Sequence, residues 1–205
     1  MKRIIQNLKF ICFILLIGTV LAACATTSYL NVTYQPPPES YALDGKEIFF
    51  DFKDMRTDKT VLSETAQKKL KNFTGIFSLT VASQGEKGPV VGAFYLPSLF
   101  QEAFTRSLVN MGAELLPEPK NDEPILEIVL KDFILDVVGR KWVASIRYET
   151  DLIKNGNLLA SQNISGNAER YDLLGRKDAD KLLGEIFTDI VNKLDIHKLF
   201  EQAGL

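Results

Sequence analysis

The stretch FFDFKDMRTDKT, residues 49–60, contains the first acidic cluster that could do chemistry. A calcium loop needs oxygen ligands at alternate positions and a central glycine, and Asp51, Asp54 and Asp58 lack that spacing. In a strand, Asp51 points away from the phenylalanines beside it and toward water. Arg56 can pair with Asp58, or Asp58 can make an Asx-type turn. The pattern therefore favours the end of a strand and a solvated turn over a catalytic or metal site.

His197 is the single histidine of the chain. A zinc site takes several nitrogen, sulfur or oxygen ligands, and His197 has no cysteine partner in the processed domain. A Ser-His-acid triad would have to use His197, but the chain contains no Gly-x-Ser-x-Gly elbow. The segment from Gly85 to Gly88 is too short for a phosphate-binding loop. We therefore expect a solvent-facing or packing histidine and no metal or cofactor.

Acidic residues also lie on the two segments that alternate most regularly in the C-terminal half. Carboxylates of the glycosidase kind meet only in three dimensions, so the sequence leaves such a pair open. The simplest interpretation is that these acids are solvated strand positions, and that Trp142 and Tyr148, on the apolar face, belong to the core. We predict no enzyme. The acids concerned are Glu127, Asp132, Asp136 and Glu149.

The N-terminus is typical of a secretory signal. Three basic residues precede 14 uncharged residues, 10–23, a run shorter than the ~20 residues that span a bilayer. The run ends in Leu21-Ala22-Ala23-Cys24, which resembles the lipobox of bacterial lipoproteins. This resemblance implies a signal peptide over residues 1–23, cleavage before Cys24, a diacylglycerol on its sulfur and a further acyl chain such as palmitate on its amine. An uncleaved anchor or an ordinary signal peptide is the alternative.

Cysteine usage and charge agree with a lipidated envelope protein. Cys12 lies in the segment that is removed, so Cys24 is the only thiol left and no disulfide is expected. Removal of residues 1–23 takes away three of the 24 basic residues and none of the 26 acidic residues, which leaves a formal charge of −5. No basic block indicates nucleic acid as a partner. Ala25 after the cysteine implies sorting to the outer membrane, on its periplasmic face, with the inner membrane as the alternative.

Residues 24–45 are predicted to form the lipidated N-terminus and a tether, and residues 46–205 a single periplasmic domain. Pro36, Pro37 and Pro38 favour polyproline II, which rises about 3.1 Å per residue and would allow up to ~60 Å between domain and membrane. An edge strand near Tyr34, packed on the domain, is the alternative.

The first half of the domain predicts two strands and a helix. Residues 46–52 and 72–83 are rich in β-formers, and glycines and a proline over 84–92 indicate a loop. Ser98 and Gln101 form a capping box for a helix that Gly112 ends. The helix carries an apolar stripe, and a short strand is predicted at residues 113–117. The stripe consists of Phe100, Ala103, Phe104, Ser107, Leu108 and Met111.

The second half predicts a three-stranded meander over residues 125–136, 142–153 and 158–171, with Asn155-Gly156 at a hairpin turn. A final amphipathic helix begins near Asp178, and a further helical turn or two covers 195–202. The fold class is therefore α+β, with a largely antiparallel sheet, a C-terminal meander and two amphipathic helices packed on one face.

Several segments together resemble the YajG-like bacterial lipoproteins. They are Asp54 to Lys59 after the first strand, Leu108 to Gly112 at the end of a helix, the Asn155-Gly156-Asn157 hairpin and the closing Asp195 to Phe200. The resemblance covers most of residues 46–200, apart from the region 62–96, which is longer than the family layout implies. The layout is more distantly similar to auxiliary lipoproteins of ABC-type lipid transport systems. The YajG-like family has no agreed catalytic residues, so only the lipidation of Cys24 is implied.

Two functions fit these observations. The first is a non-enzymatic lipoprotein that docks on an envelope assembly or lipid-transport complex as an accessory subunit. The second is a periplasmic binding module for a lipid or other small apolar ligand, with Phe73, Phe77, Phe94 and Tyr95 as the candidate pocket lining. A hydrolase would require convergent carboxylates.

Overall fold

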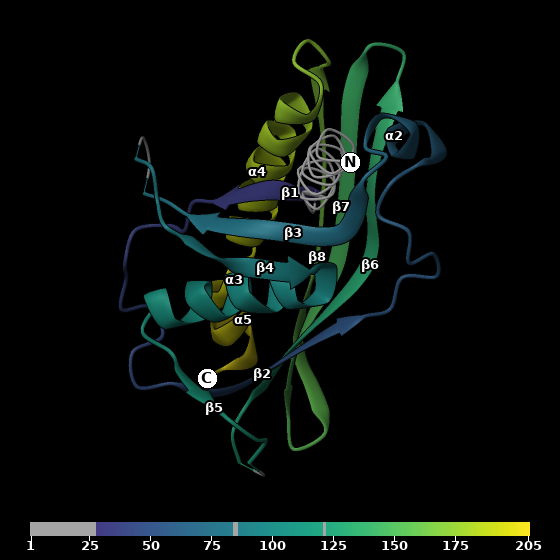
Figure 1. Cartoon of the computed structure of the whole chain (residues 1–205). Coiled ribbons are helices and arrows are strands. Elements are labelled where there is room, and N and C mark those ends of the chain that lie inside the picture. Colours follow the sequence, from purple (N-terminus) through teal and green to yellow (C-terminus); the bar gives the residue numbers. More distant parts are fainter. Residues whose placement is uncertain (1–27, 84–85, 121) are drawn as a thin grey trace, which may run out of the picture.

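The computed structural model describes residues 28–83, 86–120 and 122–205 (Figure 1). Within these ranges the chain forms an α+β fold, as predicted, and no helix there is long and apolar enough to cross a membrane. The elements are β1 Ser28–Tyr34, β2 Glu47–Asp54, α2 Glu64–Lys69, β3 Phe73–Val81, β4 Val90–Tyr95, α3 Leu96–Asn110, β5 Glu114–Leu116, β6 Ile125–Val138, β7 Lys141–Lys154, β8 Asn157–Tyr171, α4 Arg176–Asn192 and α5 Ile196–Ala203.

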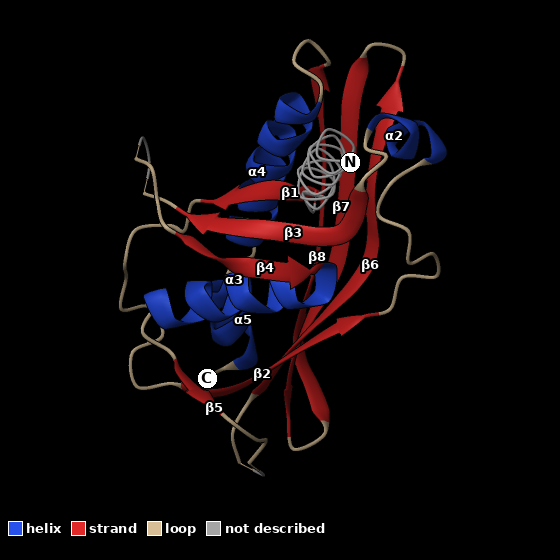
Figure 2. Cartoon of the chain, viewed as in Figure 1, coloured by secondary structure: helices blue, strands red, loops and turns tan. Residues whose placement is uncertain are grey.

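The strands form two sheets (Figure 2). The larger has the order β5-β2-β6-β7-β8 and the smaller the order β1-β3-β4. The predicted meander is confirmed, because β6, β7 and β8 pair antiparallel in sequence order. The sheets are mixed, however, since β2 runs parallel to both β5 and β6, and β1 runs parallel to β3. The antiparallel part is thus the C-terminal half of the larger sheet together with the β3–β4 pair.

The alternation of apolar and polar residues along β7 decides which face of the larger sheet is covered. Trp142, Tyr148 and their apolar neighbours are buried, whereas Arg147 between them is exposed. Asn155 and Gly156 both have positive φ, 52° and 76°, which is the geometry of a type I′ hairpin turn. The strong strand pattern and the turn signal both predicted this hairpin, and the structure confirms it.

The helices α3 and α4 pack on the covered face, as predicted. Phe104 of α3 contacts Tyr148 edge to face at 5.4 Å, and the Tyr148 hydroxyl donates to the backbone oxygen of Ile190 in α4 at 2.8 Å. Phe100 of α3 meets Phe187 of α4 with ring centroids 4.8 Å apart. Because both helices also contact strands of the smaller sheet, they lie between the two sheets and their aromatic residues form the core.

Both helix starts differ from the prediction. The helix α3 begins at Leu96 because Pro97, with its fixed φ, suits the first turn, so Ser98 is inside the helix and does not cap it. The helix α4 begins at Arg176 after Gly175, which has a φ of 63°, so Asp178 lies in the first turn. The Asp178 side chain is buried and accepts from the backbone amides of the preceding loop instead.

Two short elements were not predicted. The strand β4 spans Val90–Tyr95, where the sequence indicated a loop over 84–92, and the helix α2 spans Glu64–Lys69 in the region left without a prediction. Ser63 caps α2, since its hydroxyl accepts from the amide of Ala66 at 3.1 Å. Both elements are only six residues long, too short for a hydrophobic period to stand out.

Residues 28–34 form the strand β1 and belong to the folded domain. The predicted tether is therefore too long. Its seven residues 28–34 form a strand at the edge of the smaller sheet, which was the alternative. Leu30, Val32 and Tyr34 are buried in the core. The proline segment after β1 is also held, because the Asn110 side chain donates to the Pro37 oxygen at 2.7 Å. The polyproline run is therefore a link across the domain and not a spacer to the membrane.

Candidate functional site

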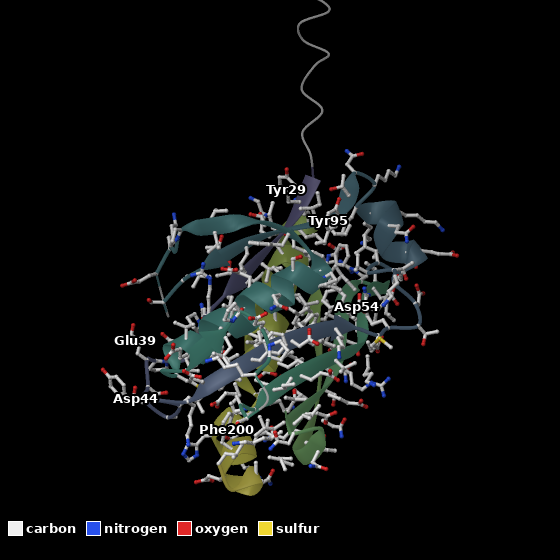
Figure 3. The ribbon with its side chains drawn as sticks, turned by 90° about the horizontal axis from the view of Figure 1, so that it is seen from below. Tyr29, Glu39, Asp44, Asp54, Tyr95 and Phe200 are labelled. Carbon is white, nitrogen blue, oxygen red and sulfur yellow. The ribbon has the colours of Figure 1, made fainter. Side chains whose placement is uncertain are left out.

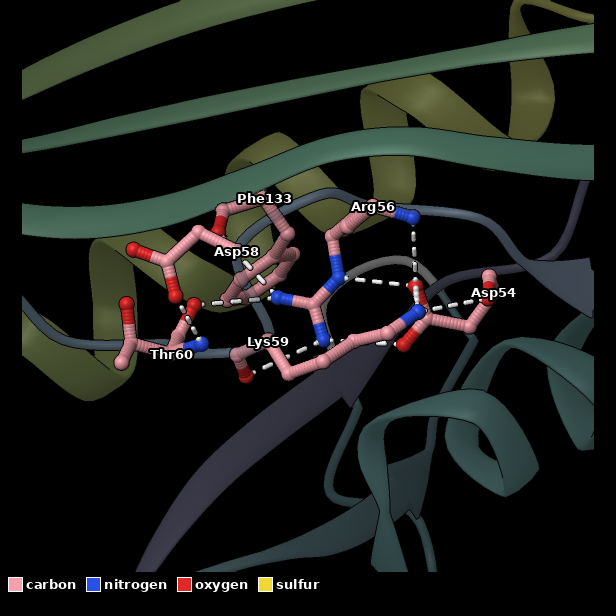
Figure 4. Close-up of polar contacts among 6 residues, drawn as sticks. All are labelled: Asp54, Arg56, Asp58, Lys59, Thr60 and Phe133. Atoms are coloured by element: carbon pink, nitrogen blue, oxygen red, sulfur yellow. Dashed lines mark hydrogen bonds and ion pairs between the residues drawn. The ribbon is translucent and has the colours of Figure 1, made fainter.

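The acidic cluster at the end of β2 is organised by a buried arginine (Figure 4). The Arg56 guanidinium donates to both carboxylate oxygens of Asp54, at 3.0 and 2.9 Å, in a bidentate pair. It also donates to the backbone oxygens of Thr60 at 3.0 Å and Lys59 at 3.3 Å, and lies 3.5 Å from that of Phe133 in β6. The partner of Arg56 is thus Asp54, and the prediction that Arg56 is solvated is wrong.

The other two acids of the cluster behave as predicted. Asp58 accepts from the amide of Thr60 at 2.8 Å, which is the Asx-type turn. Asp51 lies on the wet face of β2, with Lys53 at 3.3 Å. Three carboxylates of the stretch thus point to three different places, and the cluster has a structural role.

The surroundings of Asp54 set its protonation. Burial raises the pKa of the Asp54 carboxyl, but hydrogen bonds from Arg56 and Lys59 outweigh burial and hold the pKa below its usual value of 3.8. Asp54 is therefore the charged partner of a nearly buried ion pair, with side chains only 12% exposed for Asp54 and 4% for Arg56. A carboxylate held in this way cannot serve as a general acid near neutral pH.

Next to this cluster lies an open cleft of about 910 Å³. One wall is α2 with the residues on either side of it, and the other is the junction of β4 and α3, with the start of β3 between them. The wall of α2 is positioned by the Ser63 cap and by a hydrogen bond from the Ser63 hydroxyl to Asp136 of β6. The cleft therefore depends on the segment 56–75 that connects β2 to β3.

The lining of the cleft combines apolar surface with positive charge. Lys68 and Lys71 are exposed at its rim, and Glu64 is the one acid among its lining residues. Most of the apolar side chains lie deeper, but Pro97 is exposed and Tyr95 is 63% exposed at the mouth. Such a lining suits a molecule with an apolar part and a negatively charged group. The apolar members are Val61, Leu62, Leu70, Phe73, Tyr95, Leu96 and Pro97.

Two of the four predicted pocket residues line this cleft. Phe73 and Tyr95 do so from the start of β3 and the end of β4. Phe77 is fully buried in the core, where its ring meets that of Phe133 at 6.1 Å, and Phe94 packs partly buried against the core. Lys68 of α2 and Lys71 just after it were not predicted, and Ser63 as an N-cap was the signal that could have located them.

The remaining predicted positions lie apart from the cleft. His197 is on the surface of α5, 3.5 Å from Glu201, and so faces solvent. The described residues contain no group of three or more His, Cys, Asp and Glu placed to hold a metal. Trp142 and Tyr148 are core residues, as predicted, and the Trp142 indole donates to Asp172 at 3.0 Å.

The carboxylates of the C-terminal strands have separate partners. Glu127 accepts from Lys53, and Glu149 lies 2.7 Å from Lys131. Asp136 accepts from Ser63 and from the amide of Val137 at 2.6 Å. Asp132, in register with Arg147, is half-buried near a bulge in β6. The prediction that these acids are solvated strand positions holds for Glu127, Glu149 and Asp132, while Asp136 connects β6 to α2.

The chain enters the fold beside the cleft. Cys24 lies outside the described residues, but Ser28 is in register with Phe73, which lines the cleft. Figure 3 shows Tyr29 and Tyr95 together at one end of the molecule, with Glu39, Asp44 and Phe200 toward the other. The start of β1 and the mouth of the cleft therefore share one end.

The outer edge of β1 is closed by side chains of α4. Asp180 accepts from the backbone and side-chain nitrogens of Asn31, at 2.9 and 2.7 Å. The Thr188 hydroxyl accepts from Gln35 and donates to Thr33, and the Asn192 amide donates to the Gln35 oxygen at 2.8 Å. The strand that follows Cys24 is thus fixed on both edges.

A glycine makes this approach possible. A Cβ at Gly184 would lie 3.1 Å from the Thr33 oxygen and 3.2 Å from its nitrogen, tighter than ordinary contacts. Burial raises the pKa of Asp180 above its usual value, although the Asn31 donors oppose this. The Gly184 contact and the Asp180 bonds together hold α4 against the strand backbone.

No protein-family model and no curated protein matches the chain. Among solved structures, protein XCC0632 of Xanthomonas campestris, described under the family model DUF330, aligns with a TM-score of 0.55 and 11% identity, over 86% of this chain and 96% of that one. The chain shares this fold. The rare lipoprotein B of Shewanella oneidensis aligns with a TM-score of 0.42 and 9% identity, over 72% and 89% of the two chains.

The hypothetical protein CT253 of Chlamydia trachomatis aligns with a TM-score of 0.43 and 10% identity, over 87% of this chain and 100% of that one. The last two scores are too low to bear on the argument, and 11% identity to the Xanthomonas protein extends to the fold alone. The resemblance to YajG-like lipoproteins stays a prediction from the sequence.

Proposed function

We propose that this chain is a lipid-anchored bacterial envelope lipoprotein without catalytic activity, held at the periplasmic face of the outer membrane by acyl chains on Cys24. The observation that carries the proposal is the sequence Leu21-Ala22-Ala23-Cys24, placed four residues before a strand that is built into the domain. Buried methylenes contribute about 0.8 kcal/mol each, so two or three acyl chains anchor a protein permanently.

Processing tests this proposal. The Cys24→Ser variant should accumulate as the full-length precursor and lose labelling with a palmitate analogue, because both modification and cleavage need the thiol. Cys12→Ser is the matched control, since it also removes a cysteine but should be processed and labelled normally. Labelling that persists in Cys24→Ser would show that the acyl chain is attached to another residue.

Within the envelope, the cleft beside α2 supports a role as a binding module for an amphiphile. Its apolar floor and the two lysines at its rim fit a ligand with hydrocarbon and a phosphate or carboxylate group. Arg56 lines the cleft but is saturated by Asp54 and backbone oxygens, so Lys68 and Lys71 are the cations that remain for a ligand. The carboxylate of Glu64 disfavours anions on its side of the rim.

Native mass spectrometry of the full-length protein, extracted in mild detergent, tests this role. We expect a lipid-sized adduct that is reduced several-fold in the Tyr95→Ala variant and in the double variant Lys68→Glu with Lys71→Glu. Tyr41→Ala is the matched control, because Tyr41 is 86% exposed and is not among the residues that line the cleft. Preparations without any adduct, or an equal loss in Tyr41→Ala, would rule out the cleft as the binding site.

The free edge of β8 supports a second role, that of an accessory subunit docked on an envelope complex. β8 ends the larger sheet, so this 15-residue strand has no strand on its outer side among the described residues. Only part of the strand is engaged by neighbours, such as Ser165, whose oxygen accepts from Lys193 at 3.0 Å. Leu158 is 60% exposed near its start. An open strand edge with exposed apolar side chains is suited to pairing with another chain.

Site-specific photo-crosslinking in living cells tests the docking role. A photoreactive residue in place of Leu158 should give a reproducible adduct with one envelope protein. The same residue in place of Arg147, exposed on the wet face of β7, is the control and should give none. An absence of adducts at Leu158, with the lipidated protein present at its normal level, would contradict docking through β8.

A further inference from the structure

The distance between the lipid anchor and the domain is limited by the chain itself. If Cys24 carries the acyl chains, as proposed above, only three residues separate it from Ser28, the first residue of β1. Four Cα–Cα steps span at most ~14 Å when fully extended. Since β1 is fixed by β3 and α4, the end of the domain at which β1 starts must lie at the membrane surface.

That end of the domain carries α2. Ser28 is in register with Phe73, and Lys71 precedes Phe73 by two residues in the turn that follows α2. On its other side α2 reaches the loop between β8 and α4, because Lys69 forms an ion pair with Asp172. Figure 1 shows α2, the β6–β7 turn and the β8–α4 loop at the same end of the long sheet. These segments therefore form a continuous surface that starts next to the anchor.

This surface exposes apolar side chains on a rigid loop. Leu173 and Leu174 are 75% and 69% exposed, and Tyr171 is 62% exposed. The loop is not loose, because the buried Asp178 carboxylate accepts from the backbone amides of both leucines, at 2.8 Å for Leu173. Val138, the last residue of β6 before the β6–β7 turn, is 59% exposed. The fold thus holds leucines in solvent where nothing within the described chain covers them.

Basic residues surround the exposed leucines. Lys68, Lys71, Arg140 and Lys177 are exposed and have no ion-pair partner among the residues that the structure describes. The acids nearby are mostly engaged: Asp172 with Lys69, Glu169 with Lys141, and Glu185 with Arg170. Glu64 is the exception on α2. A processed chain with a formal charge of −5 therefore has a local excess of positive charge here.

We propose that this surface, formed by α2, the β6–β7 turn and the β8–α4 loop, is a membrane-contact surface that lies against an anionic lipid bilayer. Basic residues near an anionic membrane contribute about 1 kcal/mol each, and exposed leucines and tyrosines insert at the headgroup boundary. The surface includes the rim of the cleft through Lys68 and Lys71. The cleft therefore opens beside the bilayer, from which an amphiphile enters without crossing water.

Depth-dependent quenching in reconstituted vesicles tests this proposal. The processed chain has Cys24 as its only thiol, which the lipid occupies, so Leu174→Cys provides a single site for an environment-sensitive fluorophore. Full-length lipidated protein is reconstituted in vesicles of phosphatidylethanolamine and phosphatidylglycerol that carry a lipid-attached quencher. We expect blue-shifted emission and several-fold stronger quenching at position 174 than at Tyr41→Cys. Tyr41 is an exposed control between Glu39 and Asp44, which Figure 3 shows away from Tyr29 at the start of β1.

Variants that reverse the charge of the lysines, and vesicles of a different lipid composition, separate the possible outcomes. Lys68→Glu with Lys71→Glu, or vesicles of phosphatidylcholine alone, should reduce the quenching at position 174. Equal quenching at positions 174 and 41, in protein whose acylation is verified by mass, would overturn the membrane-contact surface while the anchor stands. Protein that carries no acyl group after purification from membranes would overturn the proposed anchor, and the contact surface with it.

Discussion

The guanidinium of Arg56 connects the end of β2, the turn at Lys59 and Thr60, and β6 at Phe133. Removal of one partner of a nearly buried ion pair leaves the other charge uncompensated, which destabilises a protein by about 3–5 kcal/mol. We expect Arg56→Ala to lower the free energy of unfolding by about 3 kcal/mol. Urea denaturation followed by Trp142 fluorescence measures it. Arg147→Ala, at an exposed site, is the control and should change stability little. If both variants lowered the free energy of unfolding equally, Arg56 would not have the structural role described here.

The depressed pKa of Asp54 makes part of the stability depend on pH. A carboxyl whose pKa is lower in the folded state stabilises that state at pH values above its unfolded pKa, and this contribution disappears as the pH falls through the folded pKa. We expect the stability difference between the wild type and Asp54→Asn to be constant at neutral pH and to shrink below about pH 4. Urea denaturation over a pH series measures it, and a difference that does not change with pH would contradict the pairing.

Two threonines should respond in opposite ways to the same substitution. Thr150 is fully buried, and its hydroxyl has no hydrogen-bond partner among the described residues. Thr150→Val should be neutral or stabilising by about 1 kcal/mol, because the buried hydroxyl is replaced by a methyl group of similar size. Thr188→Val loses two hydrogen bonds to β1 and should destabilise by about 1–2 kcal/mol. Thermal unfolding of both variants checks the pair, and a destabilised Thr150→Val would show that its hydroxyl has a partner.

Single residues were predictable from the sequence where their partners are local. The Asx turn of Asp58 and the hairpin of Asn155 and Gly156 depend on adjacent residues, and both were predicted. Arg56 was not, because its burial depends on Phe133, 77 residues away. Asp178 was assigned to the correct helix but to the wrong role, since the amides it binds belong to a loop whose path the sequence does not define.

At the scale of elements, the close contact between α4 and β1 is the feature most sensitive to one side chain. Gly184→Leu should push α4 away from the strand backbone, because even a Cβ lies 3.1 Å from the Thr33 oxygen. We expect faster hydrogen exchange of the β1 amides, with the meander little affected. Lys181→Leu, at an exposed position of the same helix, is the control. Unchanged exchange in β1 would mean that the strand does not depend on α4.

Long elements were predicted well and short ones poorly. β6, β7 and β8 each extend over 14 or 15 residues, so their alternation is clear in the sequence. α2 and β4, at six residues, supply two walls of the cleft and were missed. β1 was assigned to a tether because three prolines follow it, although its alternating Leu30, Val32 and Tyr34 indicate a strand. Of the candidate site, the sequence therefore predicted Phe73 and Tyr95 but not the elements that form two of its walls.

At the scale of the molecule, the position of β1 limits the distance between the domain and Cys24. A 20-residue tether would allow up to ~60 Å between them, whereas β1 places one end of the domain within ~14 Å of Cys24. The cleft, the exposed leucines and the lysines of the proposed membrane-contact surface all lie at that end. The outer edge of β8, proposed above as a docking edge, runs along the domain away from that end.

The intact mass of the mature protein, purified from membranes in detergent, tests whether Cys24 is its acylated N-terminus. We expect a chain that begins at Cys24, heavier than its residues by a diacylglycerol and a further acyl chain, with the added mass on the N-terminal proteolytic peptide. A chain that retains residues 1–23, or one that begins elsewhere without lipid, would contradict the proposed anchor.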